Sequence, residues 1–97
     1  MKFDFSKYIG FDWDEGNIEK NWSKHRVSYK ECEEIFLKIP LIISIDKSHS
    51  VREIRLRALG TTGADRLLFV IFTIRKNKIR IISARDQNKK ERKYFYD

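Results

Sequence analysis

The chain has 97 residues, of which 41% are apolar and 36% are charged, and its formal net charge is +7. This length suits one small domain near the lower limit for a self-sufficient core, and we expect residues 1–97 to form it. An apolar run of about 18 residues and the charged-then-apolar layout of a signal peptide are both missing, so we expect a cytoplasmic protein with no membrane partner.

The positive charge is concentrated in the second half of the chain. Residues 1–49 hold eight Lys and Arg against nine Asp and Glu, whereas residues 50–97 hold thirteen against five. Such asymmetry is typical of proteins that bind nucleic acid or an acidic protein. The single cysteine, Cys32, has no partner for an internal disulfide, which agrees with a reducing compartment, and we expect it in the core.

The first helix is predicted over residues 15–24. Residues 1–10 precede it as a short extended lead-in, and Asp14 is a suitable N-cap. Glu15 in the first turn favours the helix dipole, and Ile18 and Trp22 share one side. The alternative use of Asp12, Asp14 and Glu15 as a metal site requires more converging oxygen ligands than these acids supply. We therefore predict neither a metal nor another cofactor.

A second helix follows directly. Ser28 and Glu31 have the spacing of a capping box, and Val27 and Cys32 occupy the positions of a hydrophobic staple. The apolar stripe expected to face the core consists of Cys32, Ile35, Phe36 and Ile39. Pro40 ends this helix.

After Pro40 the apolar period changes to that of strands. Four strands are predicted over residues 41–45, 53–59, 66–75 and 79–84, separated by polar turns at 46–50, 60–65 and 76–78. In the second strand Ile54, Leu56 and Ala58 alternate with Glu53, Arg55 and Arg57, which indicates a buried face and a charged open face. Residues 88–96 are predicted as a final helix.

The expected fold is therefore α+β, with two N-terminal helices, a four-stranded antiparallel meander and a C-terminal helix. We expect the helices to cover one face of the sheet and the other face to stay partly open.

Arginines mark both ends of the last predicted strand, Arg80-Ile-Ile-Ser-Ala-Arg85, which is followed by Glu91-Arg92. Arginine is permanently charged, and its planar fork of donors matches phosphate oxygens. Several arginines around one sheet therefore suggest a phosphate-bearing ligand. The alternative interpretation is that these arginines are solvated strand ends.

The chain also resembles a known family. The residues that carry the resemblance are Phe11-Asp12-Trp13-Asp14, Asn21 to Ser28, Glu34-Ile35-Phe36, Gly60, Arg80 to Arg85, and Glu91-Arg92. Together they resemble the BrnT ribonuclease toxins of bacterial BrnT/BrnA toxin-antitoxin modules. The chain departs from the family pattern at Gly16-Asn17-Ile18, at Ile39-Pro40, and at Arg26, which replaces a glycine and would be strained at a positive φ.

This resemblance implies a RelE-like fold, an RNA substrate and a BrnA-like antitoxin that carries a DNA-binding domain. It also implies that the two proteins together repress their own operon. Toxin and antitoxin would form a hetero-oligomer in which acidic groups or steric cover block the arginines.

RNA cleavage without a metal is chemically feasible with these residues. The ribose 2′-OH is an internal nucleophile, so the protein must chiefly align it and stabilise charge on the phosphate. We expect one cationic pocket on the open side of the sheet. The predicted catalytic residues are Arg80, Arg85, Arg57 and Glu53, and the predicted RNA-binding residues are Arg55, Arg75, Arg92, Lys24 and His25.

Several roles stay open at this level. His25 can act as a proton-transfer group, but we favour a histidine that closes the helix end; Glu53 and His49 are further candidate bases. Arg55 and Arg57 can pair with Glu53 instead of RNA. Trp13 and Trp22 can stack on bases, but a core position is favoured. The rival functions are a non-enzymatic RNA- or DNA-binding module and a module that docks an acidic partner.

Overall fold

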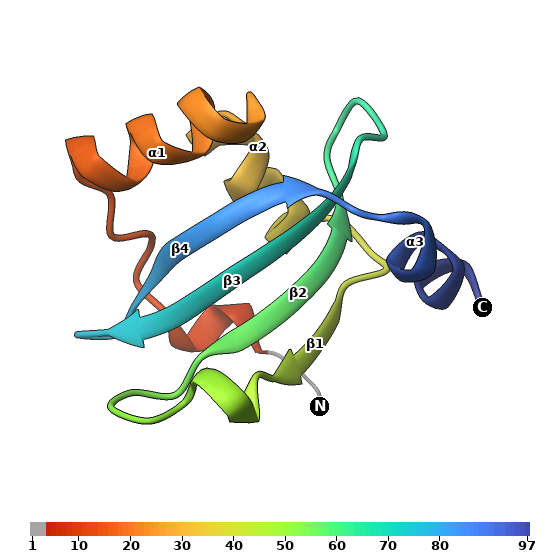
Figure 1. Cartoon of the computed structure of the whole chain (residues 1–97). Coiled ribbons are helices and arrows are strands. Elements are labelled where there is room, and N and C mark those ends of the chain that lie inside the picture. The colour runs from red at the N-terminus through yellow and green to blue at the C-terminus, as the bar shows by residue number, and fades with distance from the viewer. Residues whose placement is uncertain (1–3) are drawn as a thin grey trace.

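The computed structural model describes residues 4–97, and in them a four-stranded antiparallel sheet is combined with three α-helices (Figure 1). The strands follow chain order, β1-β2-β3-β4, so the predicted meander and the α+β class are confirmed. The strands are β1 (Ile42–Ile45), β2 (Leu56–Thr61), β3 (Leu67–Arg75) and β4 (Lys78–Asp86). The helices are α1 (Glu15–His25), α2 (Tyr29–Glu34) and α3 (Lys89–Tyr96), and 3-10 turns occur at Phe5–Lys7, Ile35–Leu37 and Lys47–His49.

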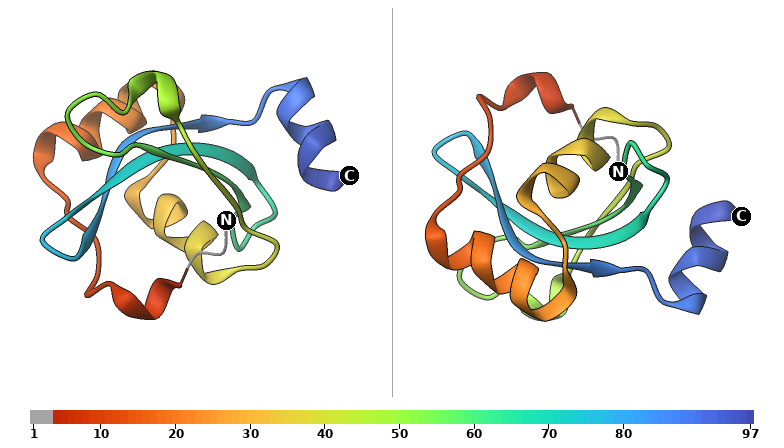
Figure 2. Two further views of the ribbon diagram at one scale, coloured as in Figure 1. Left: turned by 90° about the horizontal axis from the view of Figure 1, so that it is seen from below. Right: turned by 90° about the horizontal axis from the view of Figure 1, so that it is seen from above.

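The three helices do not share one face of the sheet. α2 and the turn after it pack against one face, which is the core face. α1 runs along the edge strand β4, and α3 lies at one end of the opposite face (Figure 2). The expectation that all helices cover the same face is therefore wrong for α3, which partly covers the face we expected to be open. Within residues 4–97, no helix combines the length and apolar content needed to cross a bilayer.

The core forms where α2 meets the sheet. Its buried side chains are Val27, Cys32, Ile35, Phe36, Ile43, Leu56, Ala58, Leu68, Val70, Phe72, Ile79, Ile81 and Ala84. Gly60 is needed for this contact, because a Cβ added there would lie 2.8 Å from the Cβ of Ile35. Burial raises the pKa of the Cys32 thiol to about 12, as expected for a core cysteine.

Two buried asparagines of α1 satisfy the free edge of β4. The Asn17 side-chain amide donates to the carbonyl oxygen of Ile81 at 3.3 Å, and the backbone N–H of Ala84 donates to Oδ1 of Asn21 at 3.1 Å. Edge strands otherwise present unpaired polar groups. These two bonds fix how α1 lies along β4.

All three helices begin with a capping box, whose N-caps are Asp14, Ser28 and Asn88. The first two were predicted as N-caps, and the predicted staple residues Val27 and Cys32 are both buried. At the end of α1, Arg26 has φ 53°, the left-handed value expected where the family pattern has glycine.

The largest differences from the predicted boundaries are at the end of the second helix and the start of the second strand. Ile39 was expected to extend the core stripe, but it is 88% exposed. α2 ends at Glu34, and the chain continues through the 3-10 turn Ile35–Leu37 to an extended Lys38. The residue directly before Pro40, Ile39, disfavours helical geometry, so no helix continues to that point. The strand expected at 53–59 is instead β2 at Leu56–Thr61. In the lead-in, the structure shows the turn Phe5–Lys7, while residues 1–3 lie outside the described part of the chain.

Candidate functional site

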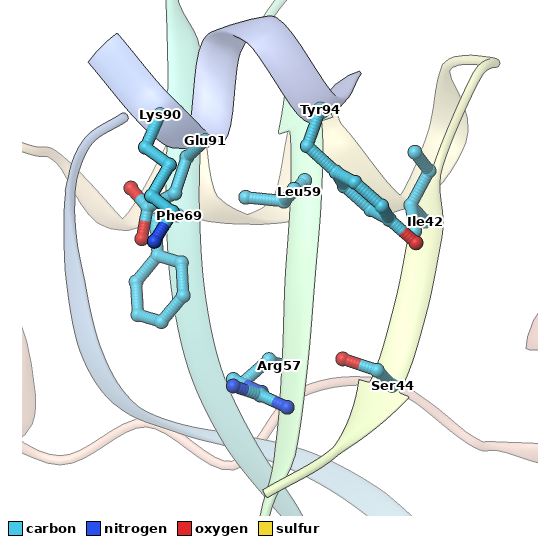
Figure 3. Close-up of a pocket in the computed structure, with 8 residues that line it drawn as sticks. All are labelled: Ile42, Ser44, Arg57, Leu59, Phe69, Lys90, Glu91 and Tyr94. Carbon is cyan, nitrogen blue, oxygen red and sulfur yellow. The ribbon is translucent and has the colours of Figure 1, made fainter. Parts of the chain in front are cut away.

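The open face of the sheet contains a hollow of about 390 Å³ beside α3. Figure 3 shows Leu59 between Phe69 and Tyr94 in this hollow, with Arg57 at its lower end. The full lining is Ile42, Ser44, Arg57, Leu59, Phe69, Lys90, Glu91 and Tyr94. We call it the α3 hollow. It combines an apolar floor with cationic groups at its rim.

Arg57 is the arginine in this hollow that remains available for a ligand. Its Nη2 donates to the carbonyl oxygen of Ile45 at 3.2 Å, and within residues 4–97 no carboxylate forms an ion pair with it. Its side chain is exposed because it projects from the open face of β2. A permanently charged fork in this position is suited to bind a phosphate.

Arg85, one of the two arginines with the strongest sequence signal, is held by the protein itself. Its Nη1 and Nη2 donate to the two carboxylate oxygens of Glu91 at 2.8 and 2.9 Å. Its guanidinium also lies 4.1 Å from the centre of the Phe69 ring. Burial alone would raise the pKa of Glu91, but Arg85 and the backbone N–H of Asn88 hold it below its usual range.

The other strong arginine, Arg80, lies in a second hollow of about 400 Å³, near the β3–β4 turn and the start of α1. We call this the hairpin hollow; its polar lining residues are Asp14, Asn17, Lys20, Glu53, Arg55, Arg75 and Arg80. Arg80 donates to Asp14 at 2.8 Å and lies 3.5 Å from Asp12, and these contacts raise its pKa.

Glu53 and Arg75 form the other ion pair of the hairpin hollow, with nitrogen–oxygen distances of 3.1 and 3.2 Å. The pairing holds the pKa of Glu53 below its usual range, which weakens Glu53 as a base. Glu53 therefore forms its ion pair with Arg75, while the charge of Arg55 contributes to its lowered pKa without an ion pair. The guanidinium of Arg55 has no hydrogen-bond or ion-pair partner among residues 4–97.

The structure thus divides the predicted site residues among three places. Arg57 lines the α3 hollow and Arg85 lies beside it over Phe69, while Glu53, Arg55, Arg75 and Arg80 line the hairpin hollow. The remaining predicted RNA-binding residues, Arg92, Lys24 and His25, line neither hollow. The Arg92 side chain donates to the carbonyl oxygen of Gln87, and Lys24 and His25 are exposed at the end of α1.

Sequence reasoning missed Ser44, Lys90, Glu91 and Tyr94 as members of the α3 hollow. A usable signal existed for the helical ones, because residues 90, 91 and 94 share one side of a helix.

Sequence reasoning also missed Arg66, which links the ends of α1 and β4 to the start of α2. Arg66 donates to the carbonyl oxygens of His25 and Arg26 and forms ion pairs with Glu31 and Asp86 at 3.1 and 2.6 Å.

The sequence left open whether Trp13 and Trp22 lie in the core or stack on bases, and whether His49 acts as a base. Trp13 packs against the core, as favoured, and donates to Glu33 at 2.8 Å. Trp22 is 48% exposed, so its favoured core position is wrong. The ring of His49 lies 2.9 Å from a carboxylate oxygen of Asp46.

The acids near the start of α1 are committed to an arginine. Both Asp12 and Asp14 form ion pairs with Arg80, and in residues 4–97 no three His, Cys, Asp or Glu side chains come together as metal ligands do. The open face of the sheet thus combines arginine and lysine side chains with an apolar floor.

Comparison with known proteins agrees with this picture. A search of curated proteins finds no match to the chain. Residues 13–91 match the family described as "Ribonuclease toxin, BrnT, of type II toxin-antitoxin system", and this range includes both hollows except Tyr94. The chain therefore belongs to the BrnT ribonuclease toxins of type II toxin-antitoxin systems, which act on RNA and are paired with an antitoxin.

Proposed function

We propose that this toxin is a metal-independent endoribonuclease that cleaves RNA in the α3 hollow and thereby inhibits translation in the cytoplasm. The observation that carries the proposal is the guanidinium of Arg57 at the rim of an apolar hollow, where it has one hydrogen bond to a carbonyl oxygen and no ion pair among residues 4–97. Lys90 adds a second cation on α3, and Arg85 lies beside the hollow.

The reaction that this arrangement suits is attack by the ribose 2′-oxygen on the adjacent phosphorus. The 2′-OH gives its proton to water, the new O–P bond forms, and the bond to the 5′-oxygen breaks. The 5′-oxygen takes a proton from water, so that the products carry a 2′,3′-cyclic phosphate and a 5′-hydroxyl. Negative charge grows on the non-bridging oxygens, where Arg57 and Lys90 can stabilise it. The apolar floor between Phe69 and Tyr94 can hold a base and so align the sugar.

Arg85 can assist without losing its bond to Glu91. An arginine has five N–H groups, and three of those of Arg85 donate to Glu91 and to the carbonyl oxygen of Asp86. Two therefore remain for a phosphate. Glu91 is the carboxylate that lines the α3 hollow, but Arg85 lowers its pKa as Arg75 lowers that of Glu53, so we assign the proton of the 2′-OH to solvent water rather than to either carboxylate.

Inhibition of this toxin is proposed to involve a BrnA-like antitoxin with a DNA-binding domain. Carboxylates satisfy arginine donors as phosphates do. Acidic residues of the antitoxin would therefore compete for Arg57 and Lys90 on the open face.

The test is cleavage of purified RNA by the toxin in excess chelator. We expect cleavage to persist and to leave 2′,3′-cyclic phosphate ends, and Arg57→Ala to lower kcat/KM by about 10²-fold. The matched control is Arg52→Ala, which removes an exposed arginine that lines neither hollow. A strict magnesium requirement with 5′-phosphate products would overturn the mechanism, and wild-type cleavage by a folded Arg57→Ala toxin would overturn the site.

A further inference from the structure

The two hollows lie on the same face of the sheet. On β3, Phe69 pairs with Arg85 of β4 and with Leu59 of β2, so this level of the sheet belongs to the α3 hollow. Further along β3, Thr73 pairs with Arg80 of β4. Arg55 precedes Leu56, the partner of Phe72, so Arg55 is level with Thr73 and Arg80. Arg57 projects from the open face of β2. Arg55, one residue before that strand and two residues or roughly 7 Å from Arg57, lines the hairpin hollow with Arg75 and Arg80.

The cations therefore continue from one hollow into the other. From Arg85 to the level of Arg75 the open face extends for about six residues of strand, or roughly 20 Å. At about 3.4 Å per stacked nucleotide this length matches roughly six nucleotides of a single strand. Non-specific single-strand sites commonly cover about 4–16 nucleotides along such a positively charged groove.

Inside the hairpin hollow, the cations outnumber the carboxylates. Lys20, Arg55, Arg75 and Arg80 face Asp14 and Glu53. The two carboxylates each bind one arginine, so they fix Arg75 and Arg80 in place. The guanidinium of Arg55 then has no hydrogen bond or ion pair among residues 4–97 and interacts with Glu53 only through its charge. The Lys20 ammonium makes one long contact, 3.5 Å from the carbonyl oxygen of Ile82.

We propose that the hairpin hollow is a second RNA site, which binds backbone phosphates next to the cleaved bond through Arg55 and Lys20. The toxin is then a single-strand ribonuclease that holds its substrate along the open face, with the cleaved phosphate in the α3 hollow. This inference rests on the proposed function, since that function places the cleaved bond. Continuity with the α3 hollow favours RNA over an acidic peptide as the ligand here.

The test measures binding without cleavage. RNA oligonucleotides with 2′-O-methyl groups cannot react, and their affinity is measured by fluorescence anisotropy for lengths of about two and about eight nucleotides. For the wild-type toxin we expect the longer oligonucleotide to bind at least about 10-fold more tightly. Arg55→Ala should reduce this gain to about threefold or less. It should also make the slope of log affinity against log salt concentration less steep by about 0.7, the value for one lost phosphate contact on a single strand.

Two further variants make the result specific. Arg52→Ala removes the same charge from the same loop, away from the hollow, and should keep the full gain with length. Arg57→Ala should weaken both lengths. The proposal is overturned if Arg55→Ala keeps the full gain, if Arg52→Ala loses as much as Arg55→Ala, or if Arg55→Ala weakens binding of the antitoxin but not of RNA.

Failure of the proposed function would look different. A toxin that binds RNA with this length dependence but does not cleave it would refute the proposed function and leave the second site intact. A toxin that cleaves RNA but shows no gain in affinity with length would refute the second site alone.

Discussion

Arg26 is in a backbone conformation that usually belongs to glycine. Its φ of 53° places it in the left-handed region, and its N–H caps α1 by donating to the carbonyl oxygens of Asn21 and Trp22. A residue with a Cβ loses about 1 kcal/mol or more in this region relative to glycine. A partial compensation is the contact of its guanidinium with the Trp22 ring, 5.4 Å from the ring centre.

We expect Arg26→Gly to stabilise the toxin by about 1 kcal/mol, which for a domain of this size raises Tm by about 4–8 °C. Thermal unfolding followed by circular dichroism measures the change. Arg26→Lys is the matched control, because it keeps both the charge and the Cβ and should gain nothing. A lower Tm for Arg26→Gly would mean that the contact with Trp22 outweighs the backbone strain.

Glu91 shows how one side chain serves both local and tertiary structure. It completes the capping box of α3 by accepting from the N–H of Asn88 at 2.9 Å, and it binds Arg85. The strongest arginine signal in the sequence therefore corresponds to an ion pair within the protein. The sequence could predict the position of Arg85 at the end of β4, but its pairing depends on where α3 lies.

At the scale of elements, the predictable features were the local ones. The caps at Asp14 and Ser28 depend on side chains only three residues apart, so sequence alone identifies them. The start of β2 was wrong because it depends on distant contacts. The Asp46 N–H donates to the carbonyl oxygen of Arg55, which closes the loop before the strand, and β1 then pairs with residues 56–59.

The division of the predicted arginines between two hollows is also a tertiary effect. Arg80 appeared available in the sequence, but α1 brings Asp14 to within 2.8 Å of it. Arg66 gave no functional or structural signal, although it contacts three elements. Alternation of residues could place these arginines on a face, but it could not show which of them meet a carboxylate.

Arg66 gives a prediction about the stability of α1, α2 and β4 together. Its side chain is 26% exposed, and its ion pair with Asp86 is the chief cause of the lowered pKa of Asp86. Burial alone would raise the pKa of Glu31, but the N–H of Ser28 and Arg66 together lower it. We expect Arg66→Met to cost about 1–2 kcal/mol near pH 7, because the half-buried carboxylate of Glu31 loses its partner, while the largely exposed Asp86 contributes little.

The sign of the pH effect follows from the lowered pKa values. Each carboxylate contributes stability above its unfolded pKa of about 4, and this contribution is lost as the pH falls through the lower folded value. The difference in Tm between wild type and Arg66→Met should therefore shrink from pH 7 to about pH 3. Lys38→Met, which breaks the exposed pair with Asp65, is the control and should cost under about 1 kcal/mol. If the Tm difference between wild type and Arg66→Met stays constant with pH, Arg66 stabilises the fold by packing alone.

For the whole molecule, the uneven charge of the chain becomes an uneven surface. The acidic first half supplies partners for the second: Asp14 binds Arg80, and Glu31 binds Arg66. The cations that remain on the open face, above all Arg55 and Arg57, are therefore those without such partners among residues 4–97. For locating the RNA-binding surface, the net charge of +7 is thus less informative than the positions of the arginines that have no ion pair.

The open face should make catalysis depend on salt in a specific way. If about four phosphates are bound along it, the logarithm of RNA affinity should fall with the logarithm of salt concentration with a slope of about −3. Between about 50 and 200 mM salt this corresponds to a loss of roughly 50-fold in kcat/KM. We expect kcat at saturating RNA to change little, because bound RNA already has its phosphates paired and salt screens chiefly the approach and binding of the strand.

Steady-state cleavage of a labelled oligonucleotide at several salt concentrations measures both kcat and kcat/KM. Arg52→Ala is again the control for a general change of charge. A kcat that falls in parallel with kcat/KM would instead place the salt-sensitive contacts in the transition state, at Arg57 and Lys90 alone.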